Sequence, residues 1–508
     1  MWDSEYISEI EYLYGYYSEL SPVRLKLALL SRGIQHSVGS YPTYLELGFG
    51  QGLSLNINAA VTSGAFYGTD FNPGQAAHAN DLSVTTGKDI KIFDDSFEEL
   101  ANRSDLPEFD IIALHGIWSW VSDDSRAAIV DIISKKLKIG GILYISYNVT
   151  PGWSPAVPLR HLLSEYAKRS ATGGILSRVE QSIAFVDGVM NADAAYFAAN
   201  PSLKKRLEQI KNSNKSYIAH EYFNTFWDPM PFSQIAVILD EAKLTFGASA
   251  SILENIDAIS IPQKARETLL KIPDPILRET TKDYFLNQQF RRDIFVKGPR
   301  RLTEFELGRQ ILSQSFICIA DKKHPPKKVK TSLGGANLIP AIYDPITSFI
   351  ASTAKTEISI GDILKDKRCK SLTKWQVWEA LLILTAEGFL APVASSETPQ
   401  EDLRASRSLN REICRKAESS ESMNFLAAPM IGMAMPVNRI QQLFLHAINL
   451  DKKKIPEYVW EVLKEQNQNL VVSNKTLERP EENLKKLKEM YQDFTMNVLP
   501  VLKKLGAV

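Results

Sequence analysis

Short apolar segments alternate with amphipathic stretches between residues 42 and 150. Strands are predicted at residues 43–47, 65–69, 90–93, 109–114 and 142–147. Residues with helical periodicity separate these segments, and this order predicts a parallel sheet with helices on both faces. This part of the chain is therefore expected to be an α/β domain.

The pattern becomes helical after Trp153. Helices are predicted at residues 159–169, 175–190, 203–211 and 232–242. Two later segments, 244–253 and 292–296, again have the character of strands. We expect these two strands to complete one edge of the sheet, which makes the helical stretch before them an insertion.

The second half of the chain has a different pattern. A basic, proline-containing stretch at 321–330 predicts a linker. Two helices at 358–364 and 373–387, followed by a short ribbon at 388–390, indicate a winged-helix-like unit. Its second helix is rich in Trp and Leu rather than in basic residues, which favours packing or partner binding over DNA binding. The polar run 394–421 is expected to separate this unit from a helical C-terminal region.

Composition narrows the class of protein. The 508 residues are 44% hydrophobic and 23% charged, as in an ordinary globular protein of roughly two to four domains. Lys plus Arg and Asp plus Glu both number 59, and this balance argues against nucleic acid as the main partner. The first residues do not resemble a signal peptide, and no apolar run approaches the length of about 18 residues that membrane insertion requires. The three cysteines have no metal-binding spacing, so we expect a cytoplasmic protein without a metal site.

A glycine-rich loop follows the first predicted strand. That strand contains Glu46, and Gly48, Gly50 and Gly52 alternate with other residues directly after it. Glycines between a strand and a helix let a nucleotide-like ligand approach the backbone. Asp70 closes the second strand about 20 residues later, where a carboxylate can accept hydrogen bonds from both hydroxyls of a ribose. Its neighbour Phe71 is a further candidate contact.

The third strand also ends on an acid. Asp95, followed by Ser96, is placed to accept a hydrogen bond from the amine of an adenine, although Asp94 could serve instead. Gly-x-Gly-x-Gly differs from the spacing of a pyrophosphate site, and Glu46 would repel a phosphate but attract an ammonium. A ligand with ribose, adenine and a cationic amino-acid end is S-adenosylmethionine. We expect the glycines to admit its methionine portion, and Glu46 to order the loop or to meet its ammonium, directly or through water.

Longer strings of residues resemble a known family. Residues 44–147 resemble the cofactor-binding core of the class I methyltransferases. The stretches 14–22, 115–121 and 146–153 are similar to bacterial methyltransferases that carry a methyltransferase regulatory domain, among them the rickettsial protein lysine methyltransferases, which modify outer-membrane proteins. Residues 220–224 and 290–292 are similar to short sequence motifs of the regulatory segment. The resemblance covers roughly residues 10–300, and it also suggests a homodimer.

The resemblance and the patterns together predict an α/β, Rossmann-like class I methyltransferase sheet with a helical insertion, followed by a winged-helix-like and a helical C-terminal region. Five parts are expected: an N-terminal aromatic cap at 1–40, an S-adenosylmethionine-binding core at 41–155, a helical insertion and regulatory segment completing the sheet at 156–300, a winged-helix-like middle domain at 301–395, and a helical C-terminal domain at 396–508.

His115 follows the fourth strand, where the reacting methyl group would lie in this fold. It is a candidate general base, because imidazole titrates near neutral pH. Alternatively, its backbone or a structural ring hydrogen bond lines the cofactor pocket. A pair of residues farther along, His220 and Glu221, has no further ligand spaced with it, so we favour structural hydrogen bonding over a metal site there.

Aromatic residues border the same end of the sheet. Trp118, Trp120, Tyr147 and Trp153 could hold a substrate ammonium or the sulfonium through cation–π attraction, with Trp120 the one expected to be core packing. Tyr14, Tyr16 and Tyr17 are candidates to close over the cofactor, or else they cover a sheet edge. The substrate-binding candidates are therefore Trp118, Tyr147, Trp153, Tyr14 and Tyr17.

Three functions follow as hypotheses. The leading one is an S-adenosylmethionine-dependent methyltransferase that modifies lysine side chains of a protein, as the resemblance implies. The second is methylation of a small molecule or of a saccharide hydroxyl, for which His115 would matter as a base. The third is a non-catalytic regulatory protein that binds the cofactor.

Overall fold

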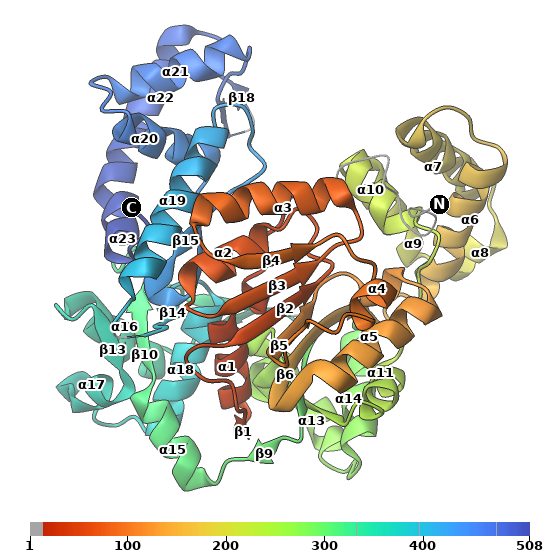
Figure 1. The fold of residues 1–508 in the computed structure, drawn as a ribbon, viewed down its shortest axis with the longest axis horizontal. Coiled ribbons are helices and arrows are strands. Elements are labelled where there is room, and N and C mark those ends of the chain that lie inside the picture. Colours follow the sequence, from red (N-terminus) through yellow and green to blue (C-terminus); the bar gives the residue numbers. More distant parts are fainter. Residues whose placement is uncertain (1–13, 332, 396, 474) are drawn as a thin grey trace.

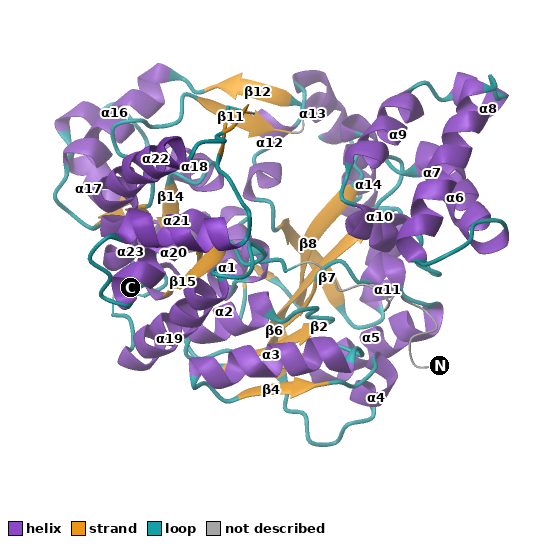
Figure 2. Ribbon diagram, turned by 90° about the horizontal axis from the view of Figure 1, so that it is seen from above, coloured by secondary structure: helices purple, strands orange, loops and turns teal. Residues whose placement is uncertain are grey.

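A central sheet organises the computed structural model, which describes residues 14–331, 333–395, 397–473 and 475–508. The sheet has seven strands in the order β4-β3-β2-β5-β6-β8-β7. Figure 1 labels β4, β3, β2, β5 and β6, and Figure 2 labels β8 and β7. The strands are β2 (Thr43–Leu47), β3 (Ala65–Thr69), β4 (Ile90–Phe93), β5 (Phe109–Leu114), β6 (Leu137–Asn148), β7 (Leu244–Ser249) and β8 (Phe290–Lys297). β8 runs antiparallel to both of its neighbours, whereas the first five strands are parallel. The two late strands therefore complete the edge, as predicted.

Each central strand is buried on both faces, because helices cover both. Along β2, Tyr44 packs into the core beneath α1 and α2, while the next residue, Leu45, packs into the core beneath α5 and α11. Successive side chains of a strand point to opposite faces, so both sets of positions must be apolar. The helices on the first face are α1 (Pro22–Ser31), α2 (Leu53–Val61) and α3 (Pro73–Thr86), and those on the second are α4 (Phe97–Ala101), α5 (Asp123–Lys136) and α11 (Phe232–Asp240).

The insertion forms a helical unit with its own core. It contains α6 (Val157–Arg169), α7 (Ile175–Asn191), α8 (Ala195–Ala199), α9 (Ser202–Asn212) and α10 (Lys215–Tyr222). Trp153, Leu163 and Val186 are among the buried side chains of that core. Between β7 and β8 lie α12 (Asp257–Ser260), α13 (Gln263–Leu269) and α14 (Pro275–Leu286). The predicted strand 244–253 is too long, because the chain turns into a 3-10 helix at Ile252–Asn255.

The middle region is built on a three-stranded sheet with the order β13-β10-β14. Before this region, the short strand β9 (Arg300–Arg301) pairs with β1 (Ile34–Gln35) from the N-terminal part of the chain. The region itself contains α15 (Glu304–Ser313), β10 (Ser315–Cys318), β11 (Lys328–Thr331), β12 (Gly334–Asn337), α16 (Pro340–Ser352), β13 (Glu357–Ser359), α17 (Ile360–Lys365), α18 (Lys374–Ala386) and β14 (Leu390–Pro392). The linker predicted at 321–330 is wrong, because β10 before it pairs with β13 and β14 after it. Its last residues enter the β11–β12 hairpin instead.

The C-terminal region packs directly on the central α/β unit. It contains α19 (Gln400–Lys416), β15 (Phe425–Ala428), β16 (Met433–Pro436), α20 (Arg439–Asn449), α21 (Ile455–Glu465), β17 (Val471–Val472), β18 (Lys475–Thr476), α22 (Pro480–Asp493) and α23 (Leu499–Lys504). The polar run 394–421 does not separate domains. Most of it forms α19, whose Leu409 and Ile413 share one core with Leu53 and Ile57 of α2. Figures 1 and 2 show this region and the helical insertion on opposite sides of the sheet.

Polar contacts fix the same interface. The hydroxyl of Ser406 on α19 donates to the backbone oxygen of Ala60 on α2 at 3.0 Å. Lys88, at the end of α3, forms an ion pair with Asp402 at 2.7 Å. Both groups of this pair are mostly shielded from water, which favours a more persistent contact than an exposed pair would make. The C-terminal region therefore supports the two helices that follow the first two strands.

The N-terminal segment runs between the central unit and the C-terminal region. The first thirteen residues of the predicted cap 1–40 lie outside the described residues. Tyr16 is buried, its ring packs against Phe425, and its hydroxyl accepts a hydrogen bond from the backbone of Ala434 at 3.0 Å. Ser21 donates to the backbone oxygen of Gly432 at 2.8 Å. The β15–β16 hairpin thus holds the segment that precedes α1.

Gly52 offers a test of the packing between α2 and α3. It has a φ of +74°, and a Cβ atom there would lie 2.3 Å from the Cβ of Ala79. Gly52→Ala should therefore lower the free energy of unfolding by about 2–5 kcal/mol, since backbone strain and overpacking add. Gly87→Ala is the matched control, because Gly87 has a φ of +68° and no atom of the described residues lies within 4 Å of the added Cβ. Equal losses for the two variants in urea unfolding would show that the contact with Ala79 is unimportant.

Candidate functional site

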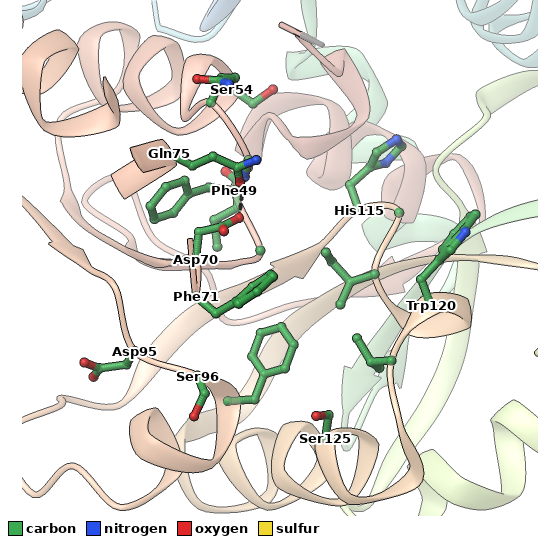
Figure 3. A pocket seen from close by; sticks show the side chains of 18 of the residues that line it. Phe49, Ser54, Asp70, Phe71, Gln75, Asp95, Ser96, His115, Trp120 and Ser125 are labelled. Atoms are coloured by element: carbon green, nitrogen blue, oxygen red, sulfur yellow. Dashed lines mark hydrogen bonds between the residues drawn. The ribbon is translucent and has the colours of Figure 1, made fainter. Parts of the chain in front are cut away.

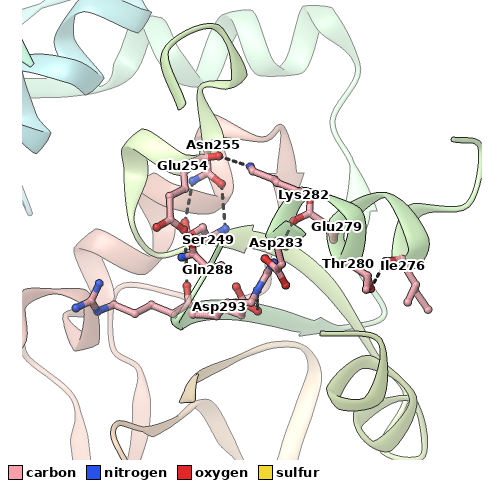
Figure 4. A network of polar contacts seen from close by, with 12 residues as sticks. Ser249, Glu254, Asn255, Ile276, Glu279, Thr280, Lys282, Asp283, Gln288 and Asp293 are labelled. Carbon is pink, nitrogen blue, oxygen red and sulfur yellow. Dashed lines mark hydrogen bonds and ion pairs between the residues drawn. The ribbon is translucent and has the colours of Figure 1, made fainter. Parts of the chain in front are cut away.

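A cavity of about 450 Å³ lies at the carboxyl ends of β2, β3, β4 and β5 (Figure 3). This volume lies within the range of cofactor sites. Its lining includes nine of the residues predicted to bind cofactor or substrate: Tyr17, Glu46, Gly48, Gly50, Asp70, Phe71, Asp95, Ser96 and His115. The crevice at the carboxyl ends of parallel strands is where α/β folds of this type bind ligands. The position of the cavity thus agrees with the location predicted from the sequence.

The first two glycines form the floor of the cavity. Gly48 and Gly50 have φ values of +70° and +57°, which favour glycine. A Cβ on Gly48 would lie 2.3 Å from the side chain of Ile117, so the loop and the segment after β5 approach too closely for any side chain. Gly52 does not line the cavity. It begins α2 against α3, so its predicted contact with the cofactor is replaced by a packing role.

Asp70 joins the glycine loop to the end of β3. Its carboxylate accepts hydrogen bonds from the backbone of Gly50 at 2.8 Å and of Asn72 at 3.1 Å. With its amide nitrogen turned toward Asp70, Gln75 donates to both carboxylate oxygens at 2.9 and 3.1 Å. Burial raises the pKa of Asp70 to about 7, although the two backbone hydrogen bonds oppose the rise. Asp70 therefore orders the loop and also presents carboxylate oxygens to the cavity.

Glu46 lies beneath the same loop. It is 4% exposed and accepts a hydrogen bond from the hydroxyl of Tyr44 at 3.2 Å. Burial raises its pKa to about 8. Since the loop amide of Gly50 bonds to Asp70, ordering of the loop falls to Asp70. An ammonium that enters the cavity would stabilise the charged form of Glu46, and the contact between Glu46 and the cofactor's ammonium stays a prediction.

Asp95, and not Asp94, reaches the lining of the cavity. Asp94 is exposed and lies outside it. Asp95 accepts a hydrogen bond from Arg103 at 2.9 Å, and the guanidinium of Arg103 packs over the ring of Phe93. In Figure 3 the carboxylate of Asp95 points away from Phe71 and His115. Arg103 therefore already binds this carboxylate, and the predicted contact between Asp95 and an adenine amine stays a prediction. Ser96 beside it caps the first turn of α4.

His115 is held in a stack of aromatic rings. The ring of Tyr17 lies over it, with centroids 3.8 Å apart, and the ring of Tyr144 lies nearly parallel at 5.9 Å. Burial and then the positive charge of Arg292 lower the pKa of His115 to about 3. An imidazole with this pKa is a weak base at neutral pH. The geometry therefore favours the alternative in which a neutral, hydrogen-bonded ring lines the pocket.

Three of the predicted substrate-binding aromatics lie in cores and not in the cavity. Trp118 and Tyr147 are fully buried beneath the second face of the sheet. Tyr147 donates to Asp293 at 2.6 Å. Trp153 packs in the core of the helical insertion, against Trp227 and Arg206. These assignments are wrong in the described structure, because the chain directs each ring into a core.

The structure also places Trp120 and the N-terminal tyrosines. Trp120 is buried, as expected, but it also lines the cavity, because the 3-10 helix Trp118–Trp120 turns Trp118 inward and leaves Trp120 at the pocket. Tyr14 lies edge-on to the ring of His78, outside the lining of the cavity, and Tyr16 packs on the C-terminal hairpin. Of the three N-terminal tyrosines, only Tyr17 reaches the lining.

Several lining residues were missed from the sequence. Gln75 lies in the first turn of α3, and Phe97, Ile117 and Val121 follow the third and fourth parallel strands. The available signal was position alone, since residues just after a parallel strand meet at the same edge of the sheet. Among the described residues, no group of three or more His, Cys, Asp and Glu side chains could hold a metal ion.

Comparison with known proteins gives the family. The model of the methyltransferase domain matches residues 45–145, and that of the predicted methyltransferase regulatory domain matches residues 214–297. An uncharacterised protein of Synechocystis sp. is 38% identical over 508 residues, with 99% of each chain covered. An uncharacterised protein of Rickettsia prowazekii is 25% identical over 346 residues, covering 65% of this chain and 59% of that one. The chain is a class I S-adenosylmethionine-dependent methyltransferase. It belongs to the family that carries this regulatory domain.

Solved structures agree with the fold of the methyltransferase. The structure of PKMT2 from Rickettsia typhi superposes with a TM-score of 0.67 at 18% identity, covering 98% of this chain and 99% of that one. The same protein in complex with AdoHcy gives the same TM-score and covers 96% of this chain and 100% of that one. At this identity the likeness shows the fold. No helix in the described parts of the methyltransferase has the length and apolar character needed to cross a bilayer.

Asp70 is expected to contribute most to cofactor binding. Asp70→Ala should weaken binding of S-adenosylhomocysteine by about 1.5–3 kcal/mol for each charge-assisted hydrogen bond lost. It should also loosen the loop that Gly50 anchors. Asp94→Ala is the control, because it removes an exposed acid outside the cavity. Calorimetric affinities that fall equally in both variants would refute the assignment of Asp70.

The raised pKa of Glu46 predicts that the affinity for the cofactor depends on pH. Its pKa of about 8 means that its carboxyl is mainly protonated at pH 7 in the ligand-free protein. Binding of the cofactor's ammonium favours the carboxylate, so binding releases a proton, and affinity should rise with pH until about pH 8. Calorimetry in buffers of different ionisation enthalpy counts this proton. In Glu46→Gln the rise between pH 7 and 8 should shrink to the smaller part that Asp70, with its pKa of about 7, contributes, and an unchanged rise would show that Glu46 is not the group that titrates.

Proposed function

We propose that the methyltransferase transfers the methyl group to the side-chain amine of lysine in a protein substrate. One observation carries the proposal: the charges that line the cavity have one sign. Five carboxyl side chains line it, from Glu46, Asp70, Asp95, Glu98 and Asp124, and no Lys or Arg of the described chain does so. A cavity of this kind favours cationic ligands, which include both a sulfonium cofactor and a lysine side chain.

The state of His115 also favours an amine over a hydroxyl. S-adenosylmethionine, when bound, supplies an activated methyl group that a neutral amine takes in a single in-line displacement. A hydroxyl acceptor needs a base to remove its proton, and His115, with a pKa of about 3, is a poor base at neutral pH. A lysine ammonium instead gives its proton to water before the methyl transfer. Desolvation and the neighbouring sulfonium lower the pKa of the amine, and the lining carboxylates oppose part of this fall.

The protein's own contribution is positioning and exclusion of water. Tyr17 stacks on His115, and Trp120 lines the same cavity. Positioning of reactants can supply about 7–11 kcal/mol of the barrier to such a transfer. Resemblance to the rickettsial protein lysine methyltransferases supports the same class of acceptor, and a protein substrate would also be the main partner. A homodimer stays a prediction from that resemblance.

Transfer of labelled methyl groups tests the acceptor. Incubation with methyl-labelled S-adenosylmethionine and fractionated bacterial lysate should place the label in protein, and acid hydrolysis should release it as methyl-lysine. Asp70→Ala is the control, because its cavity is expected to bind the donor poorly. Label in a saccharide or a small molecule would overturn the lysine proposal but keep the transfer activity. Bound donor without transfer to any fraction would instead support a regulatory, non-catalytic role.

A further inference from the structure

Two buried hydroxyl groups face one nitrogen of His115. Ala113 of β5 pairs with Tyr144 of β6, and Tyr144 and Ser146 lie on the same face of that strand. The hydroxyl of Tyr144 lies 2.7 Å from Nδ1 of His115, and that of Ser146 lies 3.3 Å from the same atom. Both residues are fully buried. The ring of His115 is thus fixed at Nδ1 as well as by the stack with Tyr17.

These contacts decide which nitrogen carries the hydrogen. The neutral imidazole has one N–H. Ser146 Oγ already accepts from the backbone of Gly116 at 2.9 Å, so its own hydrogen needs an acceptor. Ser146 also bonds to the hydroxyl of Tyr144, so within the described residues the hydrogens of these two hydroxyls can reach Nδ1 of His115 or the oxygen of the other hydroxyl. Only one of two bonded hydroxyls can donate to the other, so a hydrogen on Nδ1 would leave one of them without an acceptor in this group, which is unfavourable in a buried site. The arrangement therefore favours the tautomer with the hydrogen on Nε2.

The acidic lining of the cavity indicates a role for the Nε2–H group of His115. The methionine portion of the cofactor carries a carboxylate, yet among the described residues of the lining the charged side chains are all acids. A carboxylate bound there needs neutral donors. In Figure 3, His115 lies at the end of the cavity away from Asp95 and Ser96, with Asp70 between them. If Asp70 binds the ribose and Asp95–Ser96 border the adenine, His115 lies at the amino-acid end.

We propose that Tyr144 and Ser146 are positioning residues that hold His115 neutral with its hydrogen on Nε2, and that this N–H donates to the carboxylate of the cofactor's methionine portion. His115 is then a binding residue and not the base. The hydroxyls act through the ring, and neither of them lines the cavity.

Nuclear magnetic resonance of the unmodified protein tests the tautomer. With histidine labelled with nitrogen-15, His115→Gln identifies its signal among the seven histidines. The ligand-free protein should show a pyridine-like Nδ1 and a pyrrole-like Nε2 for His115. S-adenosylhomocysteine should shift the Nε2–H signal, whereas 5′-methylthioadenosine, which lacks the amino-acid portion, should not. A hydrogen on Nδ1, or equal shifts with both ligands, would overturn the proposal.

Calorimetry with the same two ligands tests the donor. His115→Phe should weaken S-adenosylhomocysteine by about 10- to 150-fold, the range for a hydrogen bond to a charged group, and leave 5′-methylthioadenosine unchanged. Tyr144→Phe and Ser146→Ala should reduce the same discrimination to a smaller extent, because the ring keeps its donor but loses its fixed tautomer. Equal losses for both ligands would indicate a purely structural role and contradict the proposal.

Tyr147→Phe is the matched control for Tyr144→Phe. Tyr147 lies on the same strand and is fully buried, but its side chain packs beneath the opposite face, and its hydroxyl bonds to Asp293. This variant should keep the wild-type discrimination between the two ligands. A loss equal to that of Tyr144→Phe would show that removal of any buried hydroxyl from β6 disturbs the cavity, and would contradict a specific role for Tyr144.

Discussion

One carboxylate holds the cofactor cavity together. Asp70, at the end of β3, accepts a hydrogen bond from the backbone of Gly50 in the loop after β2. The backbone of Gly48 donates to Thr69 at 2.8 Å, so the loop crosses the end of the neighbouring strand. This path requires the left-handed conformations of Gly48 and Gly50. Asp70 is only 6% exposed, so its charged form is costly to bury. The hydrogen bonds from the backbone of Gly50 and Asn72 offset part of this cost.

Parts of the chain that are distant in sequence close the cavity from the other side. Tyr16 and Tyr17 are adjacent in the sequence, but their side chains contact different parts of the protein. Tyr16 is held by Phe425 and Ala434 of the C-terminal hairpin, whereas Tyr17 stacks on His115. The C-terminal region also shares a core with α2, the helix that begins after the glycine loop. It therefore supports the cavity through packing, although none of its described residues is part of the lining.

The parallel strands and the motif were predictable because their signals are local. β2 through β5 have the predicted bounds, since runs buried on both faces must be apolar throughout. Glu46, Gly48, Gly50 and Asp70 reach the cavity because the ends of adjacent parallel strands meet. The aromatic residues were not predictable in this way. Tyr144 and Tyr147 on β6 point to opposite faces, and both faces of that strand are buried, so hydrophobicity does not indicate the face near the cofactor.

By itself, the sequence determined the α/β class, the glycine loop with its acids, and the phosphate-free cofactor. These follow from periodicity and from chemistry within a few residues. Only the tertiary structure decided that Trp120 and not Trp118 lines the cavity, that burial lowers the pKa of His115, and that the stretch 321–330 lies within a folded unit. The physical reason is that burial, ring stacking and the pKa of a side chain depend on neighbours that only folding brings together.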